Sequence, residues 1–256
     1  PPRMVKSSPP TATGLPSKEE LEVLEPLRGQ VPEEVFTKEF KLPVTDGSGN
    51  NRDGARRAIA LFKEAGWEIR DGKMTNKAGQ PFSFEMLLGE PRMERFALPF
   101  KQWAEKVGVD VRVRTVDPAQ YQKRMDDFDY DMTIELFLQS LSPGNEQREF
   151  WGSQSAGIKG SRNTIGIANP AIDKLIELVI SAPDRKSLIM RTRALDRVLL
   201  WHHYVVPQYY STEFWIAYWN KFGRPEKLAK YQPRGLATWW IDPDKEKALR
   251  SATGKS

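Results

Sequence analysis

FSFEMLL at residues 82–88 and VDVRVRTV at residues 109–116 alternate apolar and polar side chains. This alternation is typical of a β-strand that buries one face. Between the two stretches the apolar residues of 96–107 recur at helical spacing, Pro99 should bend the first turns, and Gly108 supplies a stop. The sequence therefore predicts a strand, a helix and a second strand, which is the repeating unit of an α/β layer.

The same pattern continues on both sides of this unit. Residues 121–128 predict a short helix, and residues 131–137 predict a third strand. Residues 52–65 predict an amphipathic helix that ends at Gly66. We expect all three strands to lie in one sheet, so the expected fold class is α/β.

Two further helices are expected beyond a loop that spans residues 139–169. The first begins near Asn169-Pro170, and the second runs from about Asp184 to Trp201. Residues 204–210 then predict a strand. Five of the eight tryptophans fall in the last quarter of the chain, and this density indicates burial or a ligand-facing wall rather than a simple tail.

The first 54 residues are rich in proline and in turn formers. One short helix is predicted from Ser17, which makes a capping box with Glu20. The rest of the segment is predicted to be an extended arm that must pack on another surface. We therefore expect residues 1–54 to pack poorly in this chain alone.

The composition is that of a globular protein. The 256 residues carry 39 Lys and Arg against 34 Asp and Glu, a net charge of +5, with an isoelectric point of about 9.3. Hydrophobic residues make up 39% and charged residues 29%, which allows a core. No run approaches the ~18 consecutive apolar residues that a membrane-spanning helix needs. The chain starts at Pro1 without a secretion signal, so we expect it to be processed or incomplete.

The residue types argue against most enzyme chemistry. The chain has no cysteine, which excludes disulfides, thiolate metal sites and cysteine nucleophiles. Its two histidines, His202 and His203, are adjacent, and neighbours do not share a face of a helix or strand. The glycines match neither a P-loop nor a dinucleotide fingerprint, and no spacing supports metal binding. We expect no enzyme activity, no cofactor and no metal.

The best candidate ligand-binding residues follow the third predicted strand. In α/β sheets, the crevice beyond the carboxyl ends of the strands is the usual ligand site. The loop at this place is polar and rich in backbone donors, and its candidate residues are Gln139, Ser140, Leu141, Ser142, Asn145 and Glu146. The alternative interpretation is an ordinary strand-to-helix connection.

A second candidate group consists of Ser161, Arg162 and Asn163. The planar guanidinium of Arg162 suits a bidentate clamp on a carboxylate. The alternative is that Arg162 caps a neighbouring element. We expect the two groups to form one cleft wall, in which Arg162 is the single charge partner for a ligand.

The order of the motifs resembles a known family. Four motifs resemble the second lobe of the family 5 extracellular solute-binding proteins, the oligopeptide and dipeptide receptors of ABC importers; they lie at 56–67, 82–88, 108–121 and 128–131. Five more resemble the branch that includes microcin-C-type and long-peptide receptors; they lie at 142–146, 160–163, 169–173, 193–199 and 204–207. The resemblance runs from about Gly14 to Asp242.

The resemblance implies a type II periplasmic-binding-protein fold, of which this chain holds the C-terminal half while the N-terminal half is missing. Residues 55–203 would form the ligand-binding lobe two. Residues 1–54 would be a proline-rich arm at the hinge. Residues 204–256 would be an aromatic-rich return segment that belongs to lobe one.

The resemblance also implies a function. The whole protein would be a periplasmic binding protein that encloses a peptide-like solute between two lobes and delivers it to an ABC permease in the membrane. Its partners would be that ligand, the permease and the missing N-terminal lobe. Many oligopeptide receptors hold the peptide amine with the Asp of a Trp-x-x-Asp-Tyr stretch. Here that place reads FLQSL at 137–141, so this carboxylate is not carried over.

The runner-up hypothesis is a basic, nucleic-acid-associated protein. It rests on the isoelectric point and the aromatic content alone. The basic residues are interleaved with acidic ones, whereas a nucleic-acid domain normally shows a concentrated basic stripe. We therefore expect no nucleic-acid partner. A hydrolase comes third, because no nucleophile and base can be paired.

Overall fold

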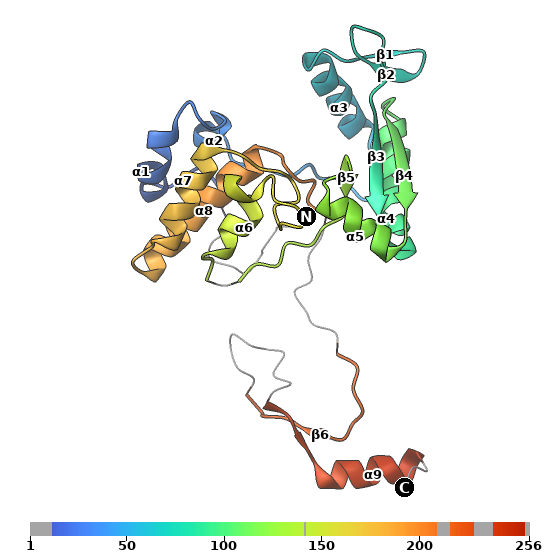
Figure 1. Cartoon of the computed structure of the whole chain (residues 1–256), viewed down its shortest axis with the longest axis vertical. Coiled ribbons are helices and arrows are strands. Elements are labelled where there is room, and N and C mark those ends of the chain that lie inside the picture. The colour runs from blue at the N-terminus through green and yellow to red at the C-terminus, as the bar shows by residue number, and fades with distance from the viewer. Residues whose placement is uncertain (1–11, 141, 209–215, 228–237, 254–256) are drawn as a thin grey trace. The chain divides into compact units, whose positions relative to one another are not determined.

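The computed structural model describes residues 12–140, 142–208, 216–227 and 238–253. The chain divides into two compact units, the first ending at Pro207 and the second beginning at Gln208 (Figure 1). This division falls close to the expected boundary after residue 203. The assignment of the segments to lobes stays a proposal.

A three-stranded parallel sheet forms the centre of the α/β part of the first unit. Its strand order is β4 (Asp110–Thr115), β3 (Ser83–Leu88) and β5 (Met132–Thr133). The three strands were predicted to share one sheet, and this is confirmed. The strand β5 is shorter than the expected 131–137 because it begins opposite Met86, close to the end of β3, which leaves little strand to pair with.

The two faces of this sheet differ. The apolar face contributes Met86, Leu88 and Val111 to a core that is closed by α3 (Arg52–Glu64) and α4 (Glu94–Glu105). The other face is polar, and α5 (Pro118–Asp126) lies beside the carboxyl ends of the strands (Figure 1). The helices expected at 52–65, 96–107 and 121–128 are thus confirmed, with bounds that differ by a few residues.

A β-hairpin that the sequence analysis missed precedes the sheet. It pairs β1 (Glu68–Arg70) with β2 (Lys73–Thr75) through the two-residue turn Asp71-Gly72. Both turn residues have positive φ angles, 51° and 76°, as a type I′ turn requires. The Asp-Gly dipeptide between two short strands was the signal for this hairpin.

The rest of the first unit is built around a helical core. Its helices are α1 (Lys18–Leu24), α2 (Glu34–Thr37), α6 (Glu146–Trp151), α7 (Pro170–Ile180) and α8 (Arg185–Trp201). Short 3-10 turns lie at Glu25–Leu27, Pro91–Met93 and Ser153–Ser155. The expected starts of α1, α7 and α8 are confirmed, because Ser17, Asn169 and Asp184 accept hydrogen bonds from the first turns.

Residues 18–37 belong to this helical core, which corrects the expectation of an extended arm that packs poorly. Leu24, Leu27 and Val35 are almost fully buried together with apolar residues of α7 and α8. The proline content suggested an extended chain, but the apolar residues between the prolines recur often enough to bury one side. Residues 38–51 contain no helix or strand.

A buried ionic group ties the start of the described chain to α8. The Arg197 side chain is 1% exposed and donates to the Gly14 carbonyl at 2.8 Å and to Glu20 Oε1 at 3.4 Å. Asp196 accepts a hydrogen bond of 2.9 Å from the Ala12 amide. These contacts hold residues 12–14 on α8 and explain further why the arm packs.

The second unit contains a small hairpin of β6 (Phe222–Gly223) and β7 (Trp240–Ile241), followed by α9 (Pro243–Thr253). Tyr218 and Trp239 contact each other edge to face at 4.8 Å. Residues 204–208 do not form the expected strand, and Tyr209 and Tyr210 lie outside the described residues. No described helix combines the length and the apolar character needed to span a membrane.

Candidate functional site

A hollow of about 180 Å³ lies where the α/β core meets the helical core of the first unit. Tyr121 of α5, Phe137 after β5, Phe150 of α6 and the loop residues Ser161 and Arg162 line it. Three of these side chains are aromatic and one is cationic. The hollow opens beyond the carboxyl end of β5, which is the place where α/β sheets usually bind ligands.

One wall of the hollow is held by a chain of hydroxyl groups. The Tyr121 and Thr133 hydroxyls lie 3.0 Å apart, and Thr133 Oγ1 donates to the Leu87 carbonyl at 2.9 Å. Gly89 makes room for the Tyr121 ring, because a Cβ at this position would lie 2.7 Å from its Cγ. The glycine at the end of β3 therefore allows the ring to close one side of the hollow.

A second tyrosine joins the two cores. The Tyr130 hydroxyl donates to the Thr164 carbonyl at 2.6 Å. Burial raises the pKa of Tyr130 to about 12, and burial also raises the pKa of Tyr121. Both phenols are therefore protonated at neutral pH, so both can donate hydrogen bonds.

The aromatic wall positions Arg162. The Phe137 ring lies 5.9 Å from that of Phe150 and 4.9 Å from that of Trp151. The Arg162 guanidinium stacks over Phe150 at 4.2 Å from the ring centre. Its ion pair with Glu149 is long, at 3.9 Å, and its side chain is 52% exposed. Arg162 can therefore exchange this weak ion pair for a ligand carboxylate while it remains stacked on the ring.

Only part of the second predicted group reaches the hollow. Ser161 and Arg162 line it, and Ser161 Oγ donates to the Ser155 carbonyl at 2.7 Å. Asn163 is 0% exposed and uses its amide inside the protein. It donates to the carbonyls of Gly152 and Ile167 and accepts from the Ile167 amide. Asn163 fixes the loop that carries Arg162 and has no surface left for a ligand.

The first predicted group lies apart from the hollow, in the segment that leads into α6. Its members bond to one another and to their neighbours: Gln147 donates to Gln139 at 2.8 Å, the Gly144 amide donates to Glu146 at 2.9 Å, and the Ser142 amide donates to Ser140 at 3.1 Å. Asn145 accepts from Arg148 at 2.9 Å. Leu141 lies outside the described residues. The structure thus divides the predicted site into two groups.

Sequence reasoning missed the aromatic lining. Phe150 and Trp151 lie on α6, a helix within the segment that was expected to be a loop. Glu135 also lines the hollow, and its carboxylate accepts only the neighbouring Leu136 amide among the described residues. In the predicted third strand, alternation places Glu135 on the other face from Ile134 and Leu136. This pattern was the available signal that Glu135 faces the ligand side. Within the described residues, no group of three or more His, Asp or Glu side chains could hold a metal ion.

Comparisons with known proteins identify relatives of this chain. The profile of the family described as "Bacterial extracellular solute-binding proteins, family 5 Middle" matches residues 28–158. The chain is 47% identical over 230 residues to the "Probable peptide-binding protein YejA" of Agrobacterium fabrum, covering 90% of this chain and 38% of that protein. It is 38% identical over 221 residues to the "Peptidoglycan-binding protein YepA" of the same organism, covering 86% of this chain and 36% of that protein.

The fold is also that of solved binding proteins. The oligopeptide-binding protein AppA of Bacillus subtilis, solved in complex with a nonapeptide, superposes with a TM-score of 0.57 at 19% identity, covering 88% of this chain and 45% of AppA. The described fold is therefore part of a type II periplasmic-binding-protein fold. The chain spans less than half the length of the relatives named here. Because the family profile covers more than half of the chain, the chain belongs to family 5 of the bacterial extracellular solute-binding proteins.

Proposed function

We propose that this chain supplies one side of the ligand site in the substrate-binding component of an ABC importer for peptide-like solutes. The observation that carries the proposal is the family match over residues 28–158. That range includes Tyr121, Phe137 and Phe150, the three aromatic residues that line the hollow. The related protein named as peptide-binding supports the choice of ligand class.

The hollow suits one end or one residue of a peptide-like ligand. The half-buried Phe137 offers apolar contact, and Arg162, which stacks over the buried Phe150, offers a planar fork for a carboxylate. Ser161 would bond to the main chain of the part of the ligand that lies in the hollow, and the exposed residues around Gln139 would bond to main chain that extends beyond it. A site that holds the main chain tolerates varied side chains, so broad peptide selectivity follows.

The remaining parts of the function belong to a longer protein. The rest of that protein would supply the opposite wall of the cleft. It would act in the periplasm without enzymatic chemistry and would release its ligand to a membrane permease. The family match leaves the nucleic-acid hypothesis without support.

A chimaeric protein tests this proposal. This chain would replace the matching 230 residues of the Agrobacterium relative, and tripeptides to pentapeptides would be titrated by calorimetry. We expect saturable binding of several unrelated sequences. If the intact relative binds the same peptides and the correctly folded chimaera binds none, the proposal is wrong.

A second candidate ligand is a peptidoglycan fragment. The similarity to the relative named as peptidoglycan-binding favours it, at 38% identity over 221 residues. Peptidoglycan stem peptides would compete with linear peptides for the same hollow. A competition titration on the chimaera separates the two classes, because the better ligand displaces the other at lower concentration.

A further inference from the structure

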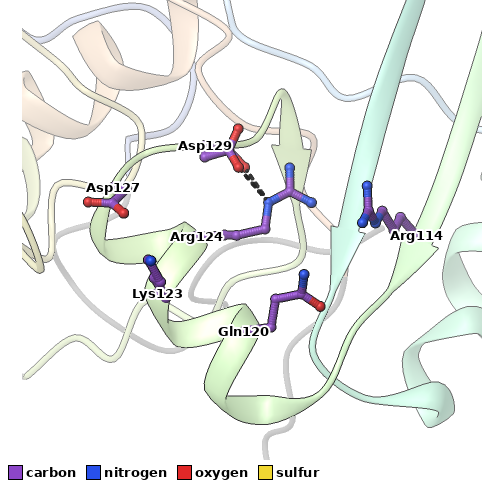
Figure 2. A pocket seen from close by; sticks show the side chains of 6 residues that line it. All are labelled: Arg114, Gln120, Lys123, Arg124, Asp127 and Asp129. Carbon is purple, nitrogen blue, oxygen red and sulfur yellow. Dashed lines mark hydrogen bonds and ion pairs between the residues drawn. The ribbon is translucent and has the colours of Figure 1, made fainter.

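A second hollow, of about 440 Å³, lies on the polar side of the sheet against another face of α5. Figure 2 shows Arg114 of β4 together with Gln120 and Arg124 of α5 extending toward the same space. Lys123, Asp127 and Asp129 complete the lining. The α5 residues of this hollow, at 120, 123 and 124, differ from those of the aromatic hollow.

Arg124 is fixed in one orientation by two carboxylates. Its Nε donates to Asp129 Oδ2 at 2.8 Å and to the Asp129 carbonyl at 2.9 Å. Its Nη1 donates to Glu85 Oε1 at 2.8 Å, and only 16% of its side chain is exposed. Its Nη2 has no acceptor among the described residues. A ligand would therefore meet N–H donors whose orientation is already set, which reduces the entropy cost of binding.

The other cations of the hollow are poorly neutralised. Arg114 lies 3.8 Å from Glu85 Oε2, which is a weak contact, and its side chain is 57% exposed. Lys123 forms no ion pair with any residue of the described ranges, and the pKa of Asp127 is lowered mainly by Lys159 and only slightly by Lys123. The nearby carboxylates are already engaged: Asp127 pairs with Lys159, and Asp129 pairs with Arg124. The unsatisfied charge in this hollow is therefore positive.

We propose that this hollow binds a small oxyanion, a phosphate or a carboxylate, between the guanidinium groups of Arg114 and Arg124. The planar guanidinium fork matches both kinds of oxyanion, and two such groups can approach one anion from different sides. The Gln120 amide adds a neutral donor, and Lys123 adds charge at the rim. This site is independent of the peptide function, since the two hollows use different faces of α5.

The test is a nuclear magnetic resonance titration of the whole 256-residue chain at constant ionic strength. Inorganic phosphate and succinate are added in separate series, with chloride as the balancing anion. We expect saturable shifts of the Arg124 Nε–H signal and of the Gln120 side-chain amide. If phosphate has the lower dissociation constant, the site prefers phosphate. If succinate has the lower dissociation constant, the site prefers a carboxylate.

Two variants on β4 distinguish anion binding at a defined site from general attraction to surface charge. Arg114→Gln should weaken binding about tenfold, because a hydrogen bond to a charged group is lost from a half-exposed position. Arg112→Gln is the matched control: it lies two residues earlier on β4, on the same face, and does not line the hollow. Its dissociation constant should equal that of the parent. Equal weakening by both variants, or shifts that never saturate, would overturn the proposal.

Discussion

The surroundings of position 108 require a glycine. Its φ angle is +84°, and a Cβ there would lie 2.7 Å from the Met74 amide nitrogen, a backbone atom that cannot move aside cheaply. That amide also donates to the Gly108 carbonyl at 2.7 Å, which links the end of α4 to β2. Both the backbone conformation and the space therefore exclude a side chain.

We predict that Gly108→Ala lowers the free energy of unfolding by about 2 kcal/mol or more, the sum of left-handed backbone strain and a steric clash. Gly66→Ala is the matched control, because Gly66 has a φ angle of +87° and no atom within 4 Å of its would-be Cβ. It should cost only about 1 kcal/mol. Urea unfolding followed by tryptophan fluorescence measures both. Equal losses would show that the close approach of the backbone does not matter.

The predicted role of Arg162 as the partner of a ligand carboxylate can be tested by mutation. We predict that Arg162→Ala weakens peptide binding to the chimaera about tenfold, at the low end for a charge-assisted hydrogen bond, because the side chain is half exposed. A peptide with an amidated C-terminus should show the same loss with the parent. Calorimetry measures both.

Arg28→Ala is the control for Arg162, since Arg28 is similarly exposed, stacks over Phe36, pairs with Glu25 and does not line the aromatic hollow. Its peptide affinity should equal that of the parent. If amidated and free peptides bind the parent equally well, Arg162 does not hold a carboxylate.

At the scale of elements, long and regular patterns were predictable and short ones were not. The strands β3 and β4 and the helix α8 have enough alternating or capped sequence to be identified. The hairpin β1–β2 and the helix α6 are each only a few residues long, and their formation depends on packing against distant elements.

The candidate site follows the same rule. Ser161 and Arg162 were selected because a planar guanidinium suits a carboxylate, and both line the hollow. The loop at 139–146 was selected because it follows a strand of the sheet, and its described residues do not line the hollow. The aromatic lining was missed because Phe137 and Phe150 meet only in the folded chain, at 5.9 Å across a segment without sequence periodicity. Asn163 looked like a ligand group, yet its burial and its three hydrogen bonds depend on the loop geometry.

The contact between α8 and the start of the chain predicts a pH dependence. Burial raises the pKa of the Asp196 carboxyl to about 6 from an ordinary value of 3.8, while Arg197 lowers it and Glu20 raises it less strongly. The folded state therefore binds the proton more tightly than the unfolded state. As the pH rises from about 4 to about 6, loss of this proton from the folded state therefore lowers the free energy of unfolding.

We predict that the free energy of unfolding of Asp196→Asn, relative to the parent, increases between pH 4 and pH 6 by about 1–2 kcal/mol. The asparagine keeps the shape of the side chain and does not ionise. Asp53→Asn is the control, because the Asp53 side chain is 98% exposed. Thermal unfolding at several pH values measures the effect. Parallel curves for parent and Asp196→Asn would contradict the prediction.

The packing of residues 18–37 also predicts where proteases cut. Within residues 12–207, we expect trypsin to cleave first after Lys38 or Lys41, because both are exposed and lie in the segment without helix or strand. Arg28 should be protected by its place between two helices and by its ion pairs with Glu25 and Glu33. Mass spectrometry of the first fragments identifies the sites. Initial cleavage after Arg28 would show that this segment is loosely held.

At the scale of the whole molecule, the described part of the second unit buries little apolar surface, and α9 has no buried residue. Its described hairpin has strands of two residues each, and an isolated two-stranded hairpin is marginal in water. Trp219 is 67% exposed and Trp240 is 52% exposed. Large exposed aromatic side chains are typical of a surface that a partner covers. This chain spans 38% of the length of one relative, and the further residues of such a protein would cover a surface of this kind.

We predict that Trp219 becomes buried when this chain stands within the longer chimaera. With 5-fluorotryptophan labelling, the fluorine signal of Trp219, assigned through Trp219→Phe, should shift between light and heavy water in the 256-residue chain. In the chimaera this solvent shift should shrink, because the ring then packs against residues of the remaining protein. Trp103 is the internal control: it lies on α4, is 37% exposed, and is covered on one face by Lys106 at 3.7 Å. Its solvent shift should be the same in both proteins.

A Trp219 signal that keeps its full solvent shift in the chimaera would contradict the prediction. Trp219 would then not pack against the rest of its own protein.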